Sequence, residues 1–145
     1  MATNLISVVR ATGRRVLLPL LLLVAGPLQA MAPIQHWQTA NGARVYFVPA
    51  PELPIVDLNV TFAAGSARDA GHAGLAHLSS TLLDMGAAGL SAGELASQVE
   101  SLGAELSTGS ARDMAWVSLR SLSDTAHLQP ALDIFRDVLA RPDFN

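Results

Sequence analysis

The chain begins with an apolar leader. The residues that come next, up to residue 62, have the hydrophobic period of β-strands. Asn41-Gly42 is typical of a tight hairpin turn, and the β-rich run 44–48 follows it. Apolar and polar residues then alternate over residues 56–62, so that Val56, Leu58, Val60 and Phe62 share one side. This period of two predicts a strand with one buried face.

From Gly71 onward the apolar residues recur at helical spacing. We expect three helices, each with a stripe that faces the core. The three stripes are Leu75, Leu78, Leu82 and Met85; Leu95, Val99 and Leu102; and Leu128, Leu132, Phe135 and Leu139. Ser91 and Glu94 form the pattern of a capping box before the second helix, and Gly103 suits its C-terminal end. Pro130 fits the third helix only if it lies in the first turn.

Two further strands are predicted between the second and third helices, over residues 104–110 and 114–122. In the latter, Ala115, Val117 and Leu119 share one face. The predicted order is therefore two strands, two helices, two strands and one helix. It favours an α+β fold, a two-layer α/β sandwich with helices packed on one face of a mostly antiparallel sheet.

The leader explains much of the apolar composition. Residues 16–25 read VLLPLLLLVA and follow three arginines, but ten residues are too few for a membrane-spanning helix, which needs about 20. The pattern predicts a signal peptide over residues 1–32, with cleavage after Ala30 or Ala32. Arg14-Arg15 leaves twin-arginine export open. We expect export, to the periplasm in a bacterium, and no membrane span once the leader is removed.

Charge and composition exclude other classes. The chain has 9 basic residues, all arginine, 12 acidic residues and no cysteine. Because three arginines lie in the leader and every acid lies beyond it, the remainder carries a net charge of −6. We therefore expect no nucleic-acid partner. Without cysteine there are no disulfides, thiolate zinc ligands or cysteine nucleophiles.

One segment carries a specific motif. It reads Gly65-Ser66-Ala67-Arg68-Asp69 and, after a short gap, Gly74-Leu75-Ala76-His77-Leu78. This segment resembles the zinc-site entry of the insulinase/pitrilysin (inverzincin) family of metallopeptidases, in which a strand ending in Gly-Ser leads to a helix that opens Gly-Leu-Ala-His. The family's next signature, a second helix followed by Leu-Gly and a strand, matches residues 94–106. The resemblance covers residues 37–144 and implies the N-terminal domain of a family member.

The resemblance implies a zinc site, and this chain departs from it. In the family's H-x-x-E-H motif, two histidines four residues apart hold zinc from one helix face, and the glutamate deprotonates the metal-bound water. The corresponding residues here are His77, Ser80 and Thr81. Threonine is a poor zinc ligand, and serine is no general base near neutral pH. We predict no catalytic residue and no bound zinc or other cofactor, with His77 a vestigial ligand hydrogen-bonded where the helix meets the sheet.

Three functions remain open. The favoured one is an exported, non-catalytic homologue, inactive alone, that partners a zinc-bearing homologous subunit in peptide degradation. By the resemblance, substrate peptide would pair with the strand at Leu106, Ser107 and Thr108. The alternatives are a structural or assembly subunit without a proteolytic role, and an active zinc metalloendopeptidase with an atypical motif.

The chain is also expected to be truncated. Pro142-Asp143-Phe144 resembles the point at which family members continue into further helices and strands. Residues 33–145 are therefore predicted to form the N-terminal part of an insulinase/pitrilysin-like domain, with sheet edges or apolar surface left exposed.

Overall fold

The computed structural model describes residues 32–144, so the predicted signal peptide lies, apart from Ala32, outside the described residues. The chain divides between Ala50 and Pro51 into two compact units. Among residues 32–144, no helix combines the length and apolar character needed to cross a membrane.

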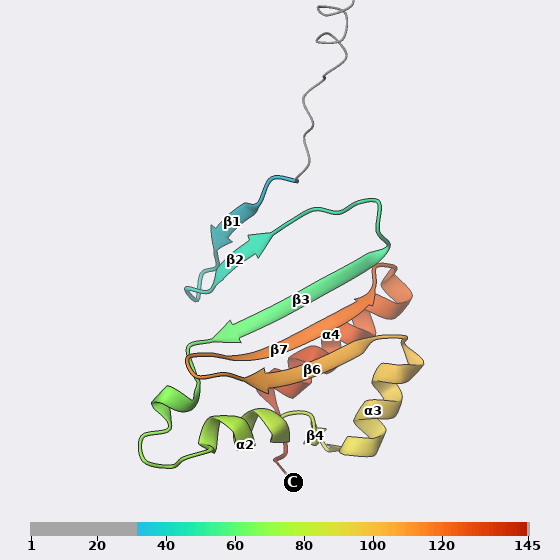
Figure 1. Ribbon diagram of the computed structural model, residues 1–145. Coiled ribbons are helices and arrows are strands. Elements are labelled where there is room, and N and C mark those ends of the chain that lie inside the picture. Colours follow the sequence, from blue (N-terminus) through green and yellow to red (C-terminus); the bar gives the residue numbers. More distant parts are fainter. Residues whose placement is uncertain (1–31, 145) are drawn as a thin grey trace, which may run out of the picture. The chain divides into compact units, whose positions relative to one another are not determined.

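The first unit contains a hairpin of β1 (Gln35–Gln38) and β2 (Arg44–Phe47) (Figure 1). Its turn is closed by a hydrogen bond from the Gly42 amide to the Thr39 carbonyl, with Gly42 at a φ of +89°. Glycine adopts this left-handed backbone without steric cost. The turn predicted at Asn41-Gly42 is thus confirmed.

The second unit is built on a three-stranded antiparallel sheet in the order β3-β7-β6. These strands are β3 (Ile55–Phe62), β6 (Glu105–Ser110) and β7 (Ala115–Leu122). They agree with the predicted strands to within one residue at each end. A second, very short sheet pairs β4 (Gly86–Ala87) with β5 (Leu90–Ser91). Neither of these short strands was predicted from the sequence.

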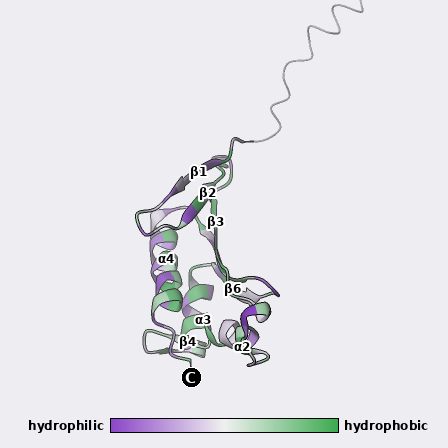
Figure 2. Cartoon of the chain, turned by 90° about the vertical axis from the view of Figure 1, so that its left-hand side faces the viewer, coloured by the Kyte–Doolittle hydropathy of each residue, from purple (hydrophilic) through white to green (hydrophobic). Residues whose placement is uncertain are grey.

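The helices of the second unit are α2 (Leu75–Leu82), α3 (Ala92–Ser101) and α4 (Thr125–Ala140), preceded by the single turn η1 (Ser66–Arg68). Figure 2 shows α3 and α4 on the same side of the sheet. Their buried side chains meet Val117 and Leu119 of β7 to form the core. The predicted α+β architecture, with helices on one face of an antiparallel sheet, is therefore confirmed.

Both predicted ends of α3 are confirmed. The Ser91 hydroxyl accepts a hydrogen bond from the Glu94 amide, and the Glu94 carboxylate accepts one from the Ser91 amide at 2.9 Å. This reciprocal pair satisfies two amides that the helix itself leaves without partners. After the helix, Gly103 takes a φ of +59°, which suits a residue just beyond a C-terminal cap.

The predicted core-facing stripe of α2 is wrong. Leu75 and Leu78 are 50% and 57% exposed, whereas Ser80 is only 3% exposed. The helix packs on β6 and η1 through the side that carries Ser80, whereas Leu75 and Leu78 point away from that side. Helical spacing shows that two residues share a face, but it does not show which face the fold covers.

The buried face of α4 is rotated around the helix axis relative to the predicted stripe. The buried residues are Ala131, Ile134, Phe135 and Val138, whereas the other predicted residues, Leu128, Leu132 and Leu139, are half-buried. Pro130 was expected in the first turn and is instead the sixth residue of the helix. It therefore removes the hydrogen bond that would reach the Ala126 carbonyl.

Replacing Pro130 with alanine is expected to raise the free energy of unfolding by about 1–2 kcal/mol. Proline costs about 3 kcal/mol more than alanine inside a helix, and the freer unfolded chain of the variant offsets about 1 kcal/mol of this gain. Urea unfolding followed by circular dichroism measures the change. The exposed variant Gln129→Ala is the control, and an equal or smaller gain for Pro130→Ala would contradict the prediction.

Acid is expected to destabilise the second unit. A hydrogen bond from Arg120 lowers the pKa of Asp57, one from Arg141 lowers the pKa of Asp137, and one from Ser91 lowers the pKa of Glu94. A carboxyl group whose pKa is lower in the folded state stabilises the fold above its unfolded pKa of about 4. That contribution is lost as the pH falls through the folded pKa. The urea midpoint should therefore be steady from pH 7 to about 5 and fall below about pH 4; a midpoint that rises on acidification would refute this.

Candidate functional site

The loop that leads from β3 to α2 depends on a close backbone contact at Gly65. The amides of Ser66 and Ala67 donate hydrogen bonds to the carbonyls of Ala111 and Arg112 at 3.1 and 2.7 Å. A Cβ atom at Gly65 would lie 2.6 Å from the Ala111 carbonyl oxygen, well inside van der Waals contact. The Gly-Ser pair of the motif thus fixes the loop against the turn between β6 and β7.

Asp69 holds the start of α2. Its side chain is buried, and its carboxylate accepts hydrogen bonds from the Gly74 amide at 2.9 Å and the Ala76 amide at 3.0 Å. The N-cap residue Gly74 has no side chain of its own to cap the helix. This role of Asp69 was not predicted from the sequence, although a glycine at the N-cap position with an acid five residues upstream was an available signal.

The three motif residues on α2 do not form a ligand cluster. His77 is exposed, which corrects the expectation that its ring is held where the helix meets the sheet. The hydroxyl groups of Ser80 and Thr81 both donate to the His77 main-chain carbonyl, each at 2.9 Å. Both hydroxyls are therefore used by the helix backbone itself.

The donor set does not fit the zinc site of the motif. Within residues 32–144, no group of three or more histidine, aspartate, glutamate or cysteine side chains is placed to hold a metal ion. A catalytic zinc site takes three protein ligands of these types. Here α2 offers one imidazole and two hydroxyls that already have acceptors.

An apolar groove of about 350 Å³ runs beside α2. Its walls include Phe62, Leu75 and Phe144, which are all about half exposed. The buried Ser80 also lines it, so the position that corresponds to the motif's glutamate opens onto an apolar surface rather than a polar cavity.

The predicted peptide-binding residues lie on β6, at one edge of the three-stranded sheet (Figure 1). Leu106 and Thr108 are half-buried, and Ser107 is exposed. Antiparallel residues alternate between hydrogen-bonded and non-hydrogen-bonded pairs, and Ala111 bonds to Met114 at the turn. In that alternation the main-chain groups of Ser107 face β7, whereas those of Leu106 and Thr108 face the free edge.

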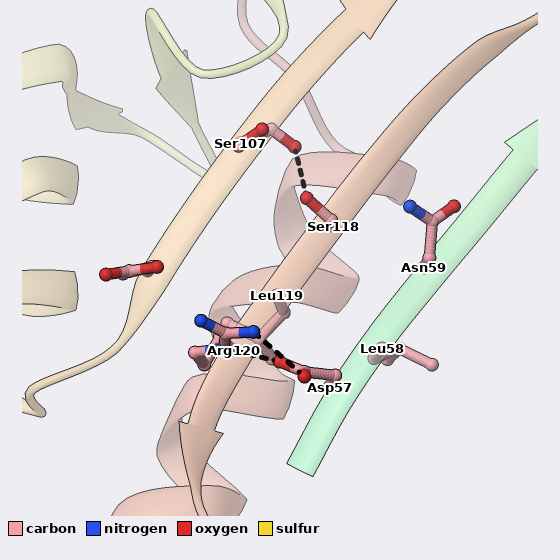
Figure 3. Close-up of a pocket in the computed structure, with 8 residues that line it drawn as sticks. Asp57, Leu58, Asn59, Ser107, Ser118, Leu119 and Arg120 are labelled. Carbon is pink, nitrogen blue, oxygen red and sulfur yellow. Dashed lines mark hydrogen bonds and ion pairs between the residues drawn. The ribbon is translucent and has the colours of Figure 1, made fainter. Parts of the chain in front are cut away.

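A polar trough of about 380 Å³ lies on the sheet face opposite the helices (Figure 3). Arg120 donates from Nε and Nη2 to the two carboxylate oxygens of Asp57, at 2.7 and 3.0 Å, and this raises the pKa of Arg120. Both side chains are more than half exposed, so solvent screens the pair and it contributes little to stability. This pair was not predicted from the sequence, because 63 residues separate the partners and only the register of β3 and β7 brings them together.

Comparison with known proteins identifies the family. The family model described as insulinase (peptidase family M16) matches residues 44–145. The chain belongs to the insulinase family of peptidases. No curated protein matches this insulinase-family chain.

Several solved structures are similar to it. A crystal structure described as the inactive domain of a peptidase M16 from Pseudomonas fluorescens has 45% sequence identity and a TM-score of 0.76, and the match covers 78% of this chain and 27% of that one. A mutant of the ferredoxin protease FusC, in complex with Arabidopsis ferredoxin, has 28% identity and a TM-score of 0.66 over 75% and 12% of the two chains. A protease from Helicobacter pylori, at 21% identity and a TM-score of 0.66 over 78% and 27%, shows the shared fold. The chain thus spans about a quarter of the first structure's length.

Proposed function

We propose that this chain is a non-catalytic member of the insulinase family that is exported and partners a zinc-bearing homologue in peptide degradation. One observation carries the proposal: the residues at the motif's base and second-ligand positions, Ser80 and Thr81, direct their hydroxyls to the His77 carbonyl. The 45% identity to a structure described as an inactive domain supports it.

The first consequence is that the chain binds no zinc tightly. The full chain should show no stoichiometric zinc binding by isothermal titration calorimetry at micromolar concentration, because His77 lacks two further ligands. The variants His77→Ala and His127→Ala, the second on a different helix, should give the same weak signal. Tight binding that His77→Ala alone abolishes would favour the active metallopeptidase.

The second consequence is a peptide-pairing edge on β6. A peptide strand added there would bond to the main-chain groups of Leu106 and Thr108. Peptides methylated at alternate backbone nitrogens test this pairing. One methylation frame should abolish binding, because it removes the amides that face β6, and the other frame should preserve it. Equal binding in both frames would contradict strand addition.

The third consequence concerns the partner. Co-expression with an insulinase-family homologue that retains H-x-x-E-H should raise peptide cleavage above that of the homologue alone. A stable complex without any change in cleavage would favour the structural or assembly subunit. Cleavage by this chain alone, blocked by a chelator, would favour the atypical active enzyme.

Export is proposed from the leader sequence. Expression of the full chain in a bacterium should give a shortened product in the periplasmic fraction, cleaved after Ala30 or Ala32. A change of Arg14-Arg15 to two lysines distinguishes the routes, because only twin-arginine export depends on that pair. Retention of an uncut chain in the membrane fraction would overturn the proposal.

A further inference from the structure

A third groove lies at the free edge of β6, and we call it the acidic groove. Its volume is about 280 Å³, and it is lined by Asp84, Leu95, Ala96, Val99, Glu100, Ala104, Glu105 and Leu106. Glu105 and Leu106 are consecutive strand residues, so their side chains leave opposite faces of the sheet. No residue of β7 lines the groove. It therefore wraps around the unpaired edge of β6 rather than lying on either face.

The groove combines an apolar floor with a net negative charge. Leu95 and Val99 are 2% and 8% exposed and belong to the core. All three charged residues around them, Asp84, Glu100 and Glu105, are acidic. Among the described residues, Asp84 and Glu100 take part in no ion pair, and Glu105 lies opposite Arg120 of β7 without forming an ion pair with it.

This combination fits a long basic side chain. Arginine and lysine lay their methylene stems on apolar surface and keep the charged head among polar groups. The three carboxylates do not form a group that could hold a metal ion. The cationic head of a long organic side chain therefore suits them better than a metal ion does. The charge of the groove is complementary to such a side chain.

The groove also lies where a paired peptide would place its side chains. The main-chain groups of Leu106 face the free edge, and the same residue lines the groove. A peptide strand that pairs with Leu106 would therefore carry its own side chains past the groove.

We propose that the acidic groove selects peptides with an arginine or lysine beside the residue that pairs with Leu106. This inference rests on the peptide pairing proposed above. It goes further in naming the class of peptide, and it assigns the selection to Asp84, Glu100 and Glu105.

The test compares extended peptides that differ at one central position, which holds arginine, its neutral analogue citrulline, or glutamate. Binding to the full chain is measured by fluorescence anisotropy at low salt. Arginine should bind about tenfold more tightly than citrulline, or about 1.4 kcal/mol, because several individually weak ion pairs act on one guanidinium. Glutamate should bind more weakly than citrulline.

The neutralising variant Asp84→Asn/Glu100→Gln/Glu105→Gln should remove the preference for arginine and leave citrulline binding unchanged. The double variant Glu100→Gln/Glu105→Gln changes only two exposed residues and should remove most of the preference. It replaces the triple variant in the test if the triple variant folds poorly. The matched control Glu52→Gln/Asp113→Asn, at two acids outside the groove, should keep it.

The outcomes separate the two proposals. Equal binding of arginine and citrulline peptides overturns the acidic groove and leaves the pairing edge standing. A preference that survives in the neutralising variants also overturns it. If no peptide binds, the pairing edge fails and the inference falls with it.

Discussion

Replacing Asp69 with alanine is expected to lower the free energy of unfolding by about 3 kcal/mol. The buried carboxylate accepts two main-chain hydrogen bonds that start α2, and a hydrogen bond to a charged group contributes about 1.5–3 kcal/mol. The alanine variant would leave two amides without acceptors at a helix end that has no other cap. Urea unfolding of the full chain, followed by circular dichroism, measures the loss.

Two variants sharpen this test. Asp69→Asn keeps one acceptor oxygen and should lose about half as much stability. Asp113→Ala removes an exposed acid from the neighbouring turn and should stay within about 0.5 kcal/mol of the unaltered chain. If Asp69→Ala is as stable as Asp113→Ala, the carboxylate does not organise the loop.

Changing Thr81 to histidine is expected to raise the affinity for zinc about a hundredfold, or about 2.8 kcal/mol. Thr81 and His77 are exposed residues four positions apart on α2, so two imidazoles would project from one helix face and share a metal ion. The His77 carbonyl keeps the hydrogen bond from Ser80 after the change. Isothermal titration with zinc measures the gain.

The control adds a histidine at a position from which it cannot share a zinc ion with His77. Ser79 is also exposed on α2, but it is two residues from His77, and helix neighbours at that spacing point in different directions. Ser79→His should leave zinc affinity near that of the unaltered chain. A comparable gain in Ser79→His and Thr81→His would show that the helix face around His77 does not set the affinity.

The sequence predicted the elements whose signals are local. The hairpin turn at Asn41-Gly42, the capping box at Ser91 and Glu94, and the alternation in β3 and β7 each depend on residues within one short segment. These features agree with the prediction because each is determined within its own segment and does not depend on which distant residues pack against it.

The parts that failed depend on partners distant in sequence. The covered face of α2 is decided by its packing on β6, which spacing alone cannot show. β4 and β5 have only two residues each and are too short for a periodic signal. Ala87 and Pro142 form a β-bridge between segments that are far apart in the chain. A local sequence pattern cannot predict such a bridge.

For the candidate site, too, the local features were predicted and the tertiary ones were not. The positions of His77, Ser80 and Thr81 on one helix followed from the motif, but the hydrogen bonds that occupy both hydroxyls did not. The edge position of β6 also agrees with the interpretation of Leu106, Ser107 and Thr108 as a pairing segment, which stays a prediction. The acidic groove was not predicted, because the residues that line it come together only after α2, α3 and β6 have packed.

The row formed by Asp57, Arg120 and Glu105 has a consequence for how uniquely the sheet assembles. In the observed pairing, Arg120 lies between two acids on the solvent face. A slip of β7 by one residue would turn every side chain of that strand to the opposite face and drive the guanidinium among the core residues of α3 and α4. Burial of an unpaired charge costs far more than the exposed pair gains. Arg120 therefore excludes misaligned sheets, even though it adds almost nothing to the stability of the correct one.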